Sequence, residues 1–240
     1  MEQFYHYNKE TKTFALTGIK NSFQEYDLNN IPEETEIIKI GDYFNYSIDI
    51  LSKFIHLTKL SIGFDFNQLI NNLPLSLTHL SLGYHFNQPV DNLPNKLTHL
   101  IFHTKFNQPV DNLPLSLTHL ILGNEFNQKI DNLPNNLIFI TFGYNFNQSL
   151  VNLPKSVKKL NIYINNKNIN LVNNLPEHIE ILSILFCNYL YRPKIDNLPI
   201  TLKEIYIENK ISRESINIPF GTIVKDYYDQ DDSDICDFDF

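Results

Sequence analysis

Three histidines recur at intervals of twenty residues in the middle of the chain: His79, His99 and His119. Imidazole is a common metal ligand, and its charge changes near neutral pH. If the three side chains stand one above another on adjacent strands, a spacing of about 4.8 Å would allow two of them to share a zinc ion. No carboxylate or thiol recurs beside them to complete a metal site. A recognition surface is therefore the stronger hypothesis, and metal binding or catalysis is the alternative.

The histidines belong to a column of equivalent positions that also contains Phe139, and the neighbouring column contains Ile101 and Ile121. Alternation of polar and apolar residues predicts that both columns point outward from strands. Ile101, Ile121 and Phe139 would then form an exposed apolar patch, and such patches often mark protein contacts. The alternative is that a loop covers these residues or that they are merely scattered. We predict a binding surface made of His79, His99, His119, Ile101, Ile121 and Phe139.

Two polar columns also recur, and their residue types favour structure over chemistry. Asp91, Asp111 and Asp131 each precede an Asn, as expected for turns closed by side-chain hydrogen bonds. Stacked amides at one coil position are expected to bond to the turn backbone and to each other. The amide column is Asn67, Asn87, Asn107, Asn127 and Asn147. The sequence contains no recognisable catalytic or phosphate-binding motif, so we predict no catalytic residue, no metal and no cofactor.

These columns exist because a unit of twenty residues repeats between Phe66 and Pro154. Each unit contains the triplet Phe-Asn-Gln and closes with a Leu-Pro step. The aromatic column is Phe66, Phe86, Phe106, Phe126 and Phe146, and we expect it to form a buried spine. A fixed period of about twenty residues indicates a stacked solenoid, because one such unit is too small to bury its own apolar face.

Within a unit, Leu80 and Leu82 alternate with His79 and Ser81, which predicts a short strand with one buried face. Gly83 follows directly, and we expect a turn with positive φ there. The sequence predicts a mainly β, leucine-rich-repeat-like solenoid of about nine coils of ~20–22 residues. Each coil has one short parallel strand and little helix. We expect an N-terminal cap over 1–30, the solenoid over 31–224 and an acidic, disordered tail over 225–240.

Composition narrows the classes of function. The formal net charge is −8, and residues 226–240 hold seven Asp without Lys or Arg, which leaves −8 minus −7, or −1, for the rest. No basic stripe is present, so we predict no nucleic-acid partner. No apolar run approaches the length of a membrane span, and the first residues do not resemble a secretory signal. Cys187 and Cys236 lie far apart, which is typical of a reducing compartment, and we expect an intracellular, cytoplasmic protein.

The repeat resembles the FNIP repeat, a relative of leucine-rich repeats that is common in amoebal and giant-virus proteins. The Phe-Asn-Gln triplets, the Leu-Pro steps and the Leu-Thr-His-Leu stretches carry the resemblance, which covers roughly residues 30–220. Members of that family often join these repeats to an F-box, as in a ubiquitin-ligase adaptor. The first thirty residues lack an obvious F-box pattern, so this role is not predicted.

A solenoid with a regular core and a varied outer surface is typical of binding scaffolds. We therefore expect a non-enzymatic scaffold that presents its strand face to a protein partner. A metal-binding or enzymatic protein that uses the histidine column is one alternative. A purely structural repeat protein without a partner is the other.

Overall fold

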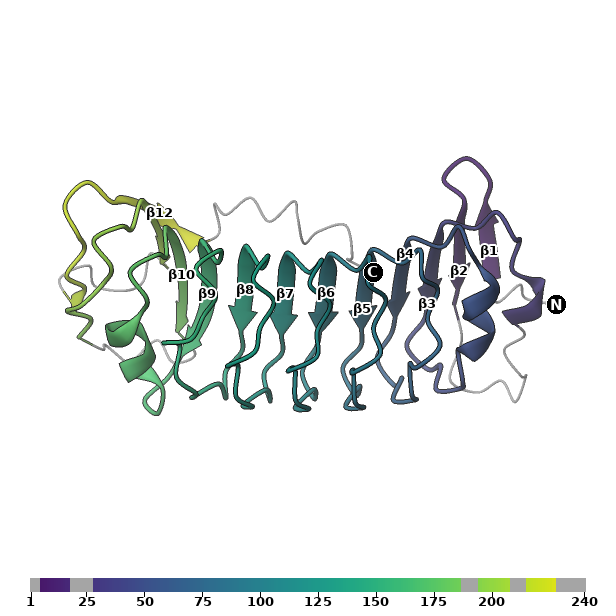
Figure 1. The fold of residues 1–240 in the computed structure, drawn as a ribbon, viewed down its shortest axis with the longest axis horizontal. Coiled ribbons are helices and arrows are strands. Elements are labelled where there is room, and N and C mark those ends of the chain that lie inside the picture. Colours follow the sequence, from purple (N-terminus) through teal and green to yellow (C-terminus); the bar gives the residue numbers. More distant parts are fainter. Residues whose placement is uncertain (1–4, 18–27, 187–193, 208–214, 228–240) are drawn as a thin grey trace.

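The chain is one curved solenoid built on a single sheet (Figure 1). The structure is a computed structural model that describes residues 5–17, 28–186, 194–207 and 215–227. Within these ranges, twelve strands follow one another in chain order. β1 (Tyr5–Asn8) pairs antiparallel with β2 (Thr13–Leu16), and every later pair is parallel. The eleven parallel strands β2 to β12 need ten connecting coils, one more than the sequence predicts.

Most of the remaining strands are four residues long, and helix is confined to short 3-10 segments of three to six residues. The helical turns in the described ranges are η1 (Leu28–Asn30), η2 (Asp49–Lys53) and η3 (Ile169–Asn174). The strands are β3 (Ile37–Ile40), β4 (Lys59–Ile62), β5 (His79–Leu82), β6 (His99–Phe102), β7 (His119–Leu122), β8 (Phe139–Phe142), β9 (Lys159–Ile164), β10 (Ile181–Phe186), β11 (Glu204–Ile207) and β12 (Ile223–Asp226). This confirms the predicted class, a mainly β parallel solenoid with little helix.

Equivalent residues of successive units lie side by side, because the sheet register repeats with the sequence. His79 pairs with His99, and Leu80 pairs with Leu100. Between the strands, the backbone N–H of Thr98 donates to the carbonyl of Thr78 over 2.9 Å, and that of Thr118 donates to Thr98 over the same distance. Each coil thus satisfies backbone groups of the coil before it, as buried peptide groups require.

The core is filled by leucines from the strands and by the Phe column from the turns. The five rings from Phe66 to Phe146 are at most 1% exposed. Neighbouring rings stack with centroids 6.0–6.1 Å apart. Phe44, which the sequence analysis did not place in this column, adds one more ring to the stack, with its centroid 6.2 Å from that of Phe66. The spine therefore runs through six successive coils.

The Asn column forms a continuous ladder of hydrogen bonds between coils. The backbone N–H of Asn87 donates to Oδ1 of Asn67 over 2.9 Å, and the same bond joins Asn107 to Asn87. The amide of Gln88 donates to the same Asn67 Oδ1 over 3.1 Å. One side-chain oxygen thereby accepts from two donors of the next coil, which holds the turn after the Phe spine in place.

The glycines that follow β5 and β7 are needed for close approach of the backbone and not for a positive φ, whereas His103 occupies the equivalent position after β6. Among the described glycines only Gly221 has a positive φ. A Cβ atom at Gly83 would lie 2.0 Å from the carbonyl oxygen of Gly63, and one at Gly123 would lie 1.8 Å from that of His103. The expectation of a positive φ was therefore wrong. Backbones stacked this closely leave no room for a side chain.

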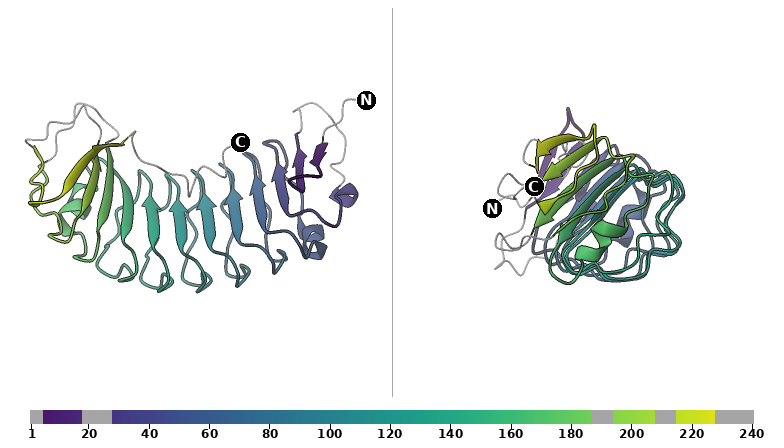
Figure 2. Two further views of the ribbon diagram at one scale, coloured as in Figure 1. Left: turned by 90° about the horizontal axis from the view of Figure 1, so that it is seen from above. Right: turned by 90° about the vertical axis from the view of Figure 1, so that its left-hand side faces the viewer.

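The solenoid bends because its coils are closer together at the sheet than in the core. The stacked imidazoles on the outward side of the strands lie 4.3 Å apart, whereas the Phe rings lie 6.0–6.1 Å apart. Wedge-shaped coils of this kind produce an arc with the strands along its inner side, as Figure 2 shows. We call the surface formed by the outward-facing side chains of β2 to β12 the concave face.

Several sequence predictions concern residues outside the described ranges. Residues 228–240 of the expected acidic tail lie there, and so do Cys187 and Cys236. Within the described ranges, no helix has the length and apolar character that crossing a bilayer requires.

Removing one ring of the spine should destabilise the protein strongly. Phe106 is fully buried between Phe86 and Phe126, so Phe106→Ala would leave a cavity and lower the free energy of unfolding by about 3–5 kcal/mol. Urea denaturation followed by circular dichroism measures this loss. Leu115→Ala is the matched control, because Leu115 is 72% exposed. A loss below about 1 kcal/mol for Phe106→Ala would contradict the buried spine.

Stability should also fall as the pH is lowered from about 7 to 5. Burial, and then the charge of Lys158, lower the pKa of His178 from its usual 6.5, and its Nε2 is buried without a hydrogen-bond partner. The unfolded chain therefore binds a proton at higher pH than the folded chain, and stability is lost as the pH falls below about 6.5.

His178→Gln should reduce this dependence when urea midpoints at pH 7 and pH 5 are compared, and the remainder comes from His103, whose pKa burial also lowers. Glu180 and Glu204 do not interfere in this window, because their lysine partners lower the pKa of both carboxyls below 4.5. An unchanged slope in the variant would show that His178 stays accessible to protons in the folded state.

Candidate functional site

The candidate site is a row of side chains on the concave face. We call the column Lys59, His79, His99, His119, Phe139 and Lys159 the His ladder. Its members pair with one another across β4 to β9. Their strand neighbours Leu60, Leu80 and Leu100 are fully buried in the core. Because successive side chains of a strand point to opposite faces, the ladder lies on the outward side.

The three imidazoles form a regular stack. The ring of His99 lies 4.3 Å from the rings of His79 and of His119, and each pair is nearly parallel at 8°. Each ring also contacts the preceding threonine, with Nδ1 of His99 2.9 Å from Oγ1 of Thr98. Equivalent contacts of 2.8 and 2.9 Å hold His79 and His119.

These threonines determine which ring nitrogen carries the proton. Oγ1 of Thr98 donates its single hydrogen to the carbonyl oxygen of Thr78 over 3.0 Å. It can therefore only accept from His99, so Nδ1 of a neutral His99 carries the hydrogen and Nε2 keeps the lone pair. The bonds of Thr78 and Thr118 to the preceding coil repeat this arrangement. The result is three Nε2 acceptors held in parallel.

Parallel rings are poorly arranged for holding a metal. A lone pair lies in the plane of its ring, so lone pairs of stacked rings run side by side and do not converge on one ion. Within the described ranges, no group of three or more His, Cys, Asp or Glu is placed to hold a metal ion. The geometry thus favours hydrogen bonding and attraction of negative charge over coordination.

The apolar part of the predicted surface is not exposed as expected. Phe139 is only 2% exposed and Ile101 only 7%, while Ile121 is partly buried. Phe139 lies between the ring of His119, with centroids 5.8 Å apart, and Lys159, whose Nζ is 5.0 Å from the Phe139 ring centroid. The expectation of an exposed apolar patch was therefore wrong, and at Phe139 the side chains of His119 and Lys159 cover the ring.

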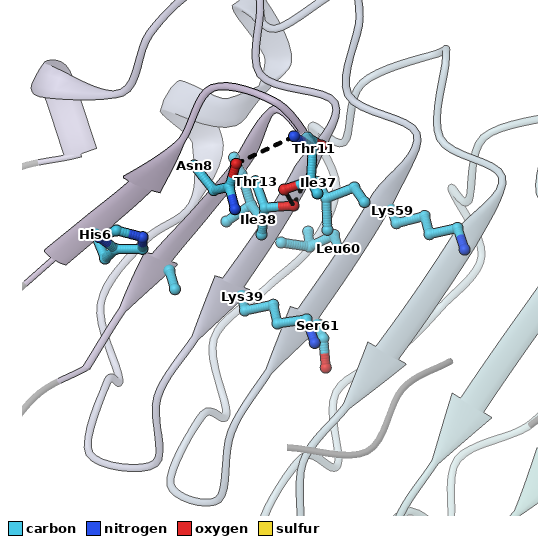
Figure 3. A pocket seen from close by; sticks show the side chains of 11 residues that line it. His6, Asn8, Thr11, Thr13, Ile37, Ile38, Lys39, Lys59, Leu60 and Ser61 are labelled. Carbon is cyan, nitrogen blue, oxygen red and sulfur yellow. Dashed lines mark hydrogen bonds between the residues drawn. The ribbon is translucent and has the colours of Figure 1, made fainter. Parts of the chain in front are cut away.

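A pocket of about 390 Å³ opens on the same face over β1 to β4, next to the start of the ladder (Figure 3). Two lysines, Lys39 and Lys59, lie on one side of it, and His6 lies on the other. Asn8 closes the hairpin at its rim, where Oδ1 accepts from the backbone N–H of Glu10 over 2.9 Å.

The sequence analysis did not find this pocket, although one signal was available. Ala15 is the only alanine of the chain, and it pairs with Lys39 of β3 and with His6 of β1. A methyl group at an outward position between longer neighbours leaves a hollow on the sheet. The antiparallel β1 forms the far wall of the pocket, and the repeat pattern does not predict that strand.

Comparison with known proteins supports the architecture. The model of the FNIP repeat family matches four overlapping windows, 66–105, 86–125, 106–145 and 126–164. Among solved structures, the chain is similar to CroV588, a circular leucine-rich-repeat protein of a giant virus. Sequence identity is 31% and the TM-score is 0.58. The match covers 85% of this chain and 35% of CroV588, so this chain spans about a third of that structure's length.

A leucine-rich repeat protein from Bacteroides ovatus is a weaker match. Its sequence identity is 16% and its TM-score is 0.26, over 85% of this chain and 69% of the other, and so low a score supports no comparison of detail. No protein with a curated description matches the sequence.

The hydrogen-bonded threonines should control the tautomer of the ladder. In Thr98→Val, His99 loses the acceptor for its Nδ1–H, so the neutral Nε2–H form should gain population. Imidazole ¹⁵N chemical shifts at pH 8 measure the two forms for each ring. The signals of His79 serve as an internal control, because Thr78 still holds that ring. A His99 spectrum identical to wild type would show that Thr98 does not set the tautomer.

Proposed function

This chain is an FNIP repeat protein with leucine-rich-repeat-like structural neighbours, and from that premise we propose that it is a non-catalytic scaffold whose concave face binds a protein partner. The His ladder is the observation that carries the proposal. It places three like acceptors in parallel across adjacent coils, between Lys59 and Lys159. A preorganised row of this kind suits an extended polypeptide that crosses the strands.

The inward and outward strand positions also differ in how much they vary between coils, which supports the proposal. Inward positions of β4 to β8 contain only Leu, Ile and Phe, whereas outward positions vary between Lys, His, Ser, Ile, Thr and Phe. Repeat proteins separate stability from recognition in this way, because the core side chains can stay constant while the outer surface varies. A purely structural repeat protein has no need for the threonine contacts that orient the ladder imidazoles.

Affinity capture with three baits tests the proposal. The concave variant carries Lys59→Glu, His99→Glu and Lys159→Glu. The control carries Leu75→Glu, Leu115→Glu and Val151→Glu at turn positions that are 72–80% exposed. Under the proposal, a protein retained by the wild type should bind the control and be lost from the concave variant. Equal retention by all three baits would move the binding site away from the concave face.

A further inference from the structure

The concave face is positively charged in a chain whose formal net charge is −8. Outward positions of its strands contain Lys39, Lys59, Lys159 and Lys225 together with the three ladder histidines. In the described strands, the one carboxylate among the outward positions is Glu204, and it already accepts from Nζ of Lys225 over 2.8 Å. The face therefore attracts negative charge, while the surface elsewhere is acidic on balance.

Side chains on this face are also sheltered. Ser81 is 1% exposed and Phe139 is 2% exposed, and Phe139 lies between the side chains of His119 and Lys159. Three polar atoms there are buried without a hydrogen-bond partner: Ser61 Oγ, Thr141 Oγ1 and Asn161 Oδ1. Buried polar atoms nearly always have a partner in native proteins, so these three atoms leave unused hydrogen-bonding capacity on this face.

Residues 228–240 have the matching chemistry. They contain six Asp and no Lys or Arg, with Ile235, Phe238 and Phe240 between the acids. The cations of the concave face complement these aspartates. Thirteen residues extend up to about 43 Å, and the seven strand spacings from β12 to β5 amount to about 34 Å. The segment begins two residues after β12 ends, so it is long enough to follow the sheet back to the ladder.

We propose that residues 228–240 bind along the concave face of their own chain, with aspartates against the lysines and imidazoles of the His ladder. The inference rests on the proposed function, because it assigns a segment of the same chain to the proposed binding surface. An outside partner that uses the face must then displace an acidic segment. The partner's own segment is expected to be acidic as well.

A nitroxide spin label on Cys236 of the full-length chain tests this, with Cys187→Ser to make the label unique. Ring C–H signals of His79, His99 and His119 should broaden, because an unpaired electron relaxes nearby protons. The same sample after chemical reduction of the nitroxide gives the reference intensities. Ladder signals that are equally sharp before and after reduction would overturn the proposal.

Charge variants separate specific binding from mere proximity. Lys59→Gln with Lys159→Gln removes two cations from the ladder and should weaken the broadening. Lys96→Gln with Lys129→Gln removes the same charge from exposed positions outside the strands and should leave the broadening unchanged. Changing the six aspartates of residues 228–240 to asparagine should abolish the effect. Broadening that survives all of these changes would contradict binding through the ladder.

A mixed sample identifies the source of the segment. Isotope-labelled chain without nitroxide is combined with unlabelled chain that carries it. Broadening of the ladder signals in this mixture alone would assign the face to a second copy and overturn the proposal. The two hypotheses can fail separately: the capture experiment tests whether the concave face binds a partner, and the spin label tests what lies on it. If both hold, the Asp-to-Asn chain should capture more partner than the wild type does.

Discussion

The backbone hydrogen bonds between successive coils are the interaction on which the rest of this structure depends. A coil of twenty residues has peptide N–H and C=O groups that find no hydrogen-bond partner within the coil. The paired strands and the Thr-to-Thr backbone bonds supply these partners from the next coil. That arrangement demands coils of equal length with equivalent residues in register. The Asn column requires the same register in the turns, because the side-chain oxygen of one Asn accepts hydrogen bonds from two donors of the following coil. At Gly83 the backbones come so close that a side chain does not fit.

The solenoid curves because different side chains set the spacing of the coils in the core and on the outward side of the strands. Phe rings stack at about 6 Å in the core, while the outward side of the strands brings imidazoles to 4.3 Å. The difference accumulates over eleven parallel strands into an arc (Figure 2). Crowding on the inner side has a consequence for recognition. Long side chains such as Lys159 cover apolar neighbours such as Phe139, so the face presents cations and hydrogen-bonding groups in place of an apolar patch.

The concave face and the rest of the chain differ in the sign of their net charge. Four lysines and one carboxylate occupy the outward strand positions of an otherwise acidic protein, so this surface has a directional field that attracts complementary segments. The threonine contacts add geometric order to this charge, because they hold each neutral imidazole in one tautomer. Electrostatic attraction and preorganisation therefore coincide on a single row of residues, which is why we place both the partner and the acidic segment there.

The sequence by itself determined the architecture of this protein. A period of twenty with apolar alternation at Leu80 and Leu82 predicts a parallel β solenoid, because one such unit buries its apolar face only against its neighbours. The same spacing brings His79, His99 and His119 together. Only the tertiary structure decided what depends on the distance between coils: the shelter of Ile101 and Phe139, the need for glycine at Gly123, and the pocket beside Ala15. Periodicity specifies which residues are neighbours, but the bend of the solenoid and the antiparallel β1 set how closely those neighbours approach.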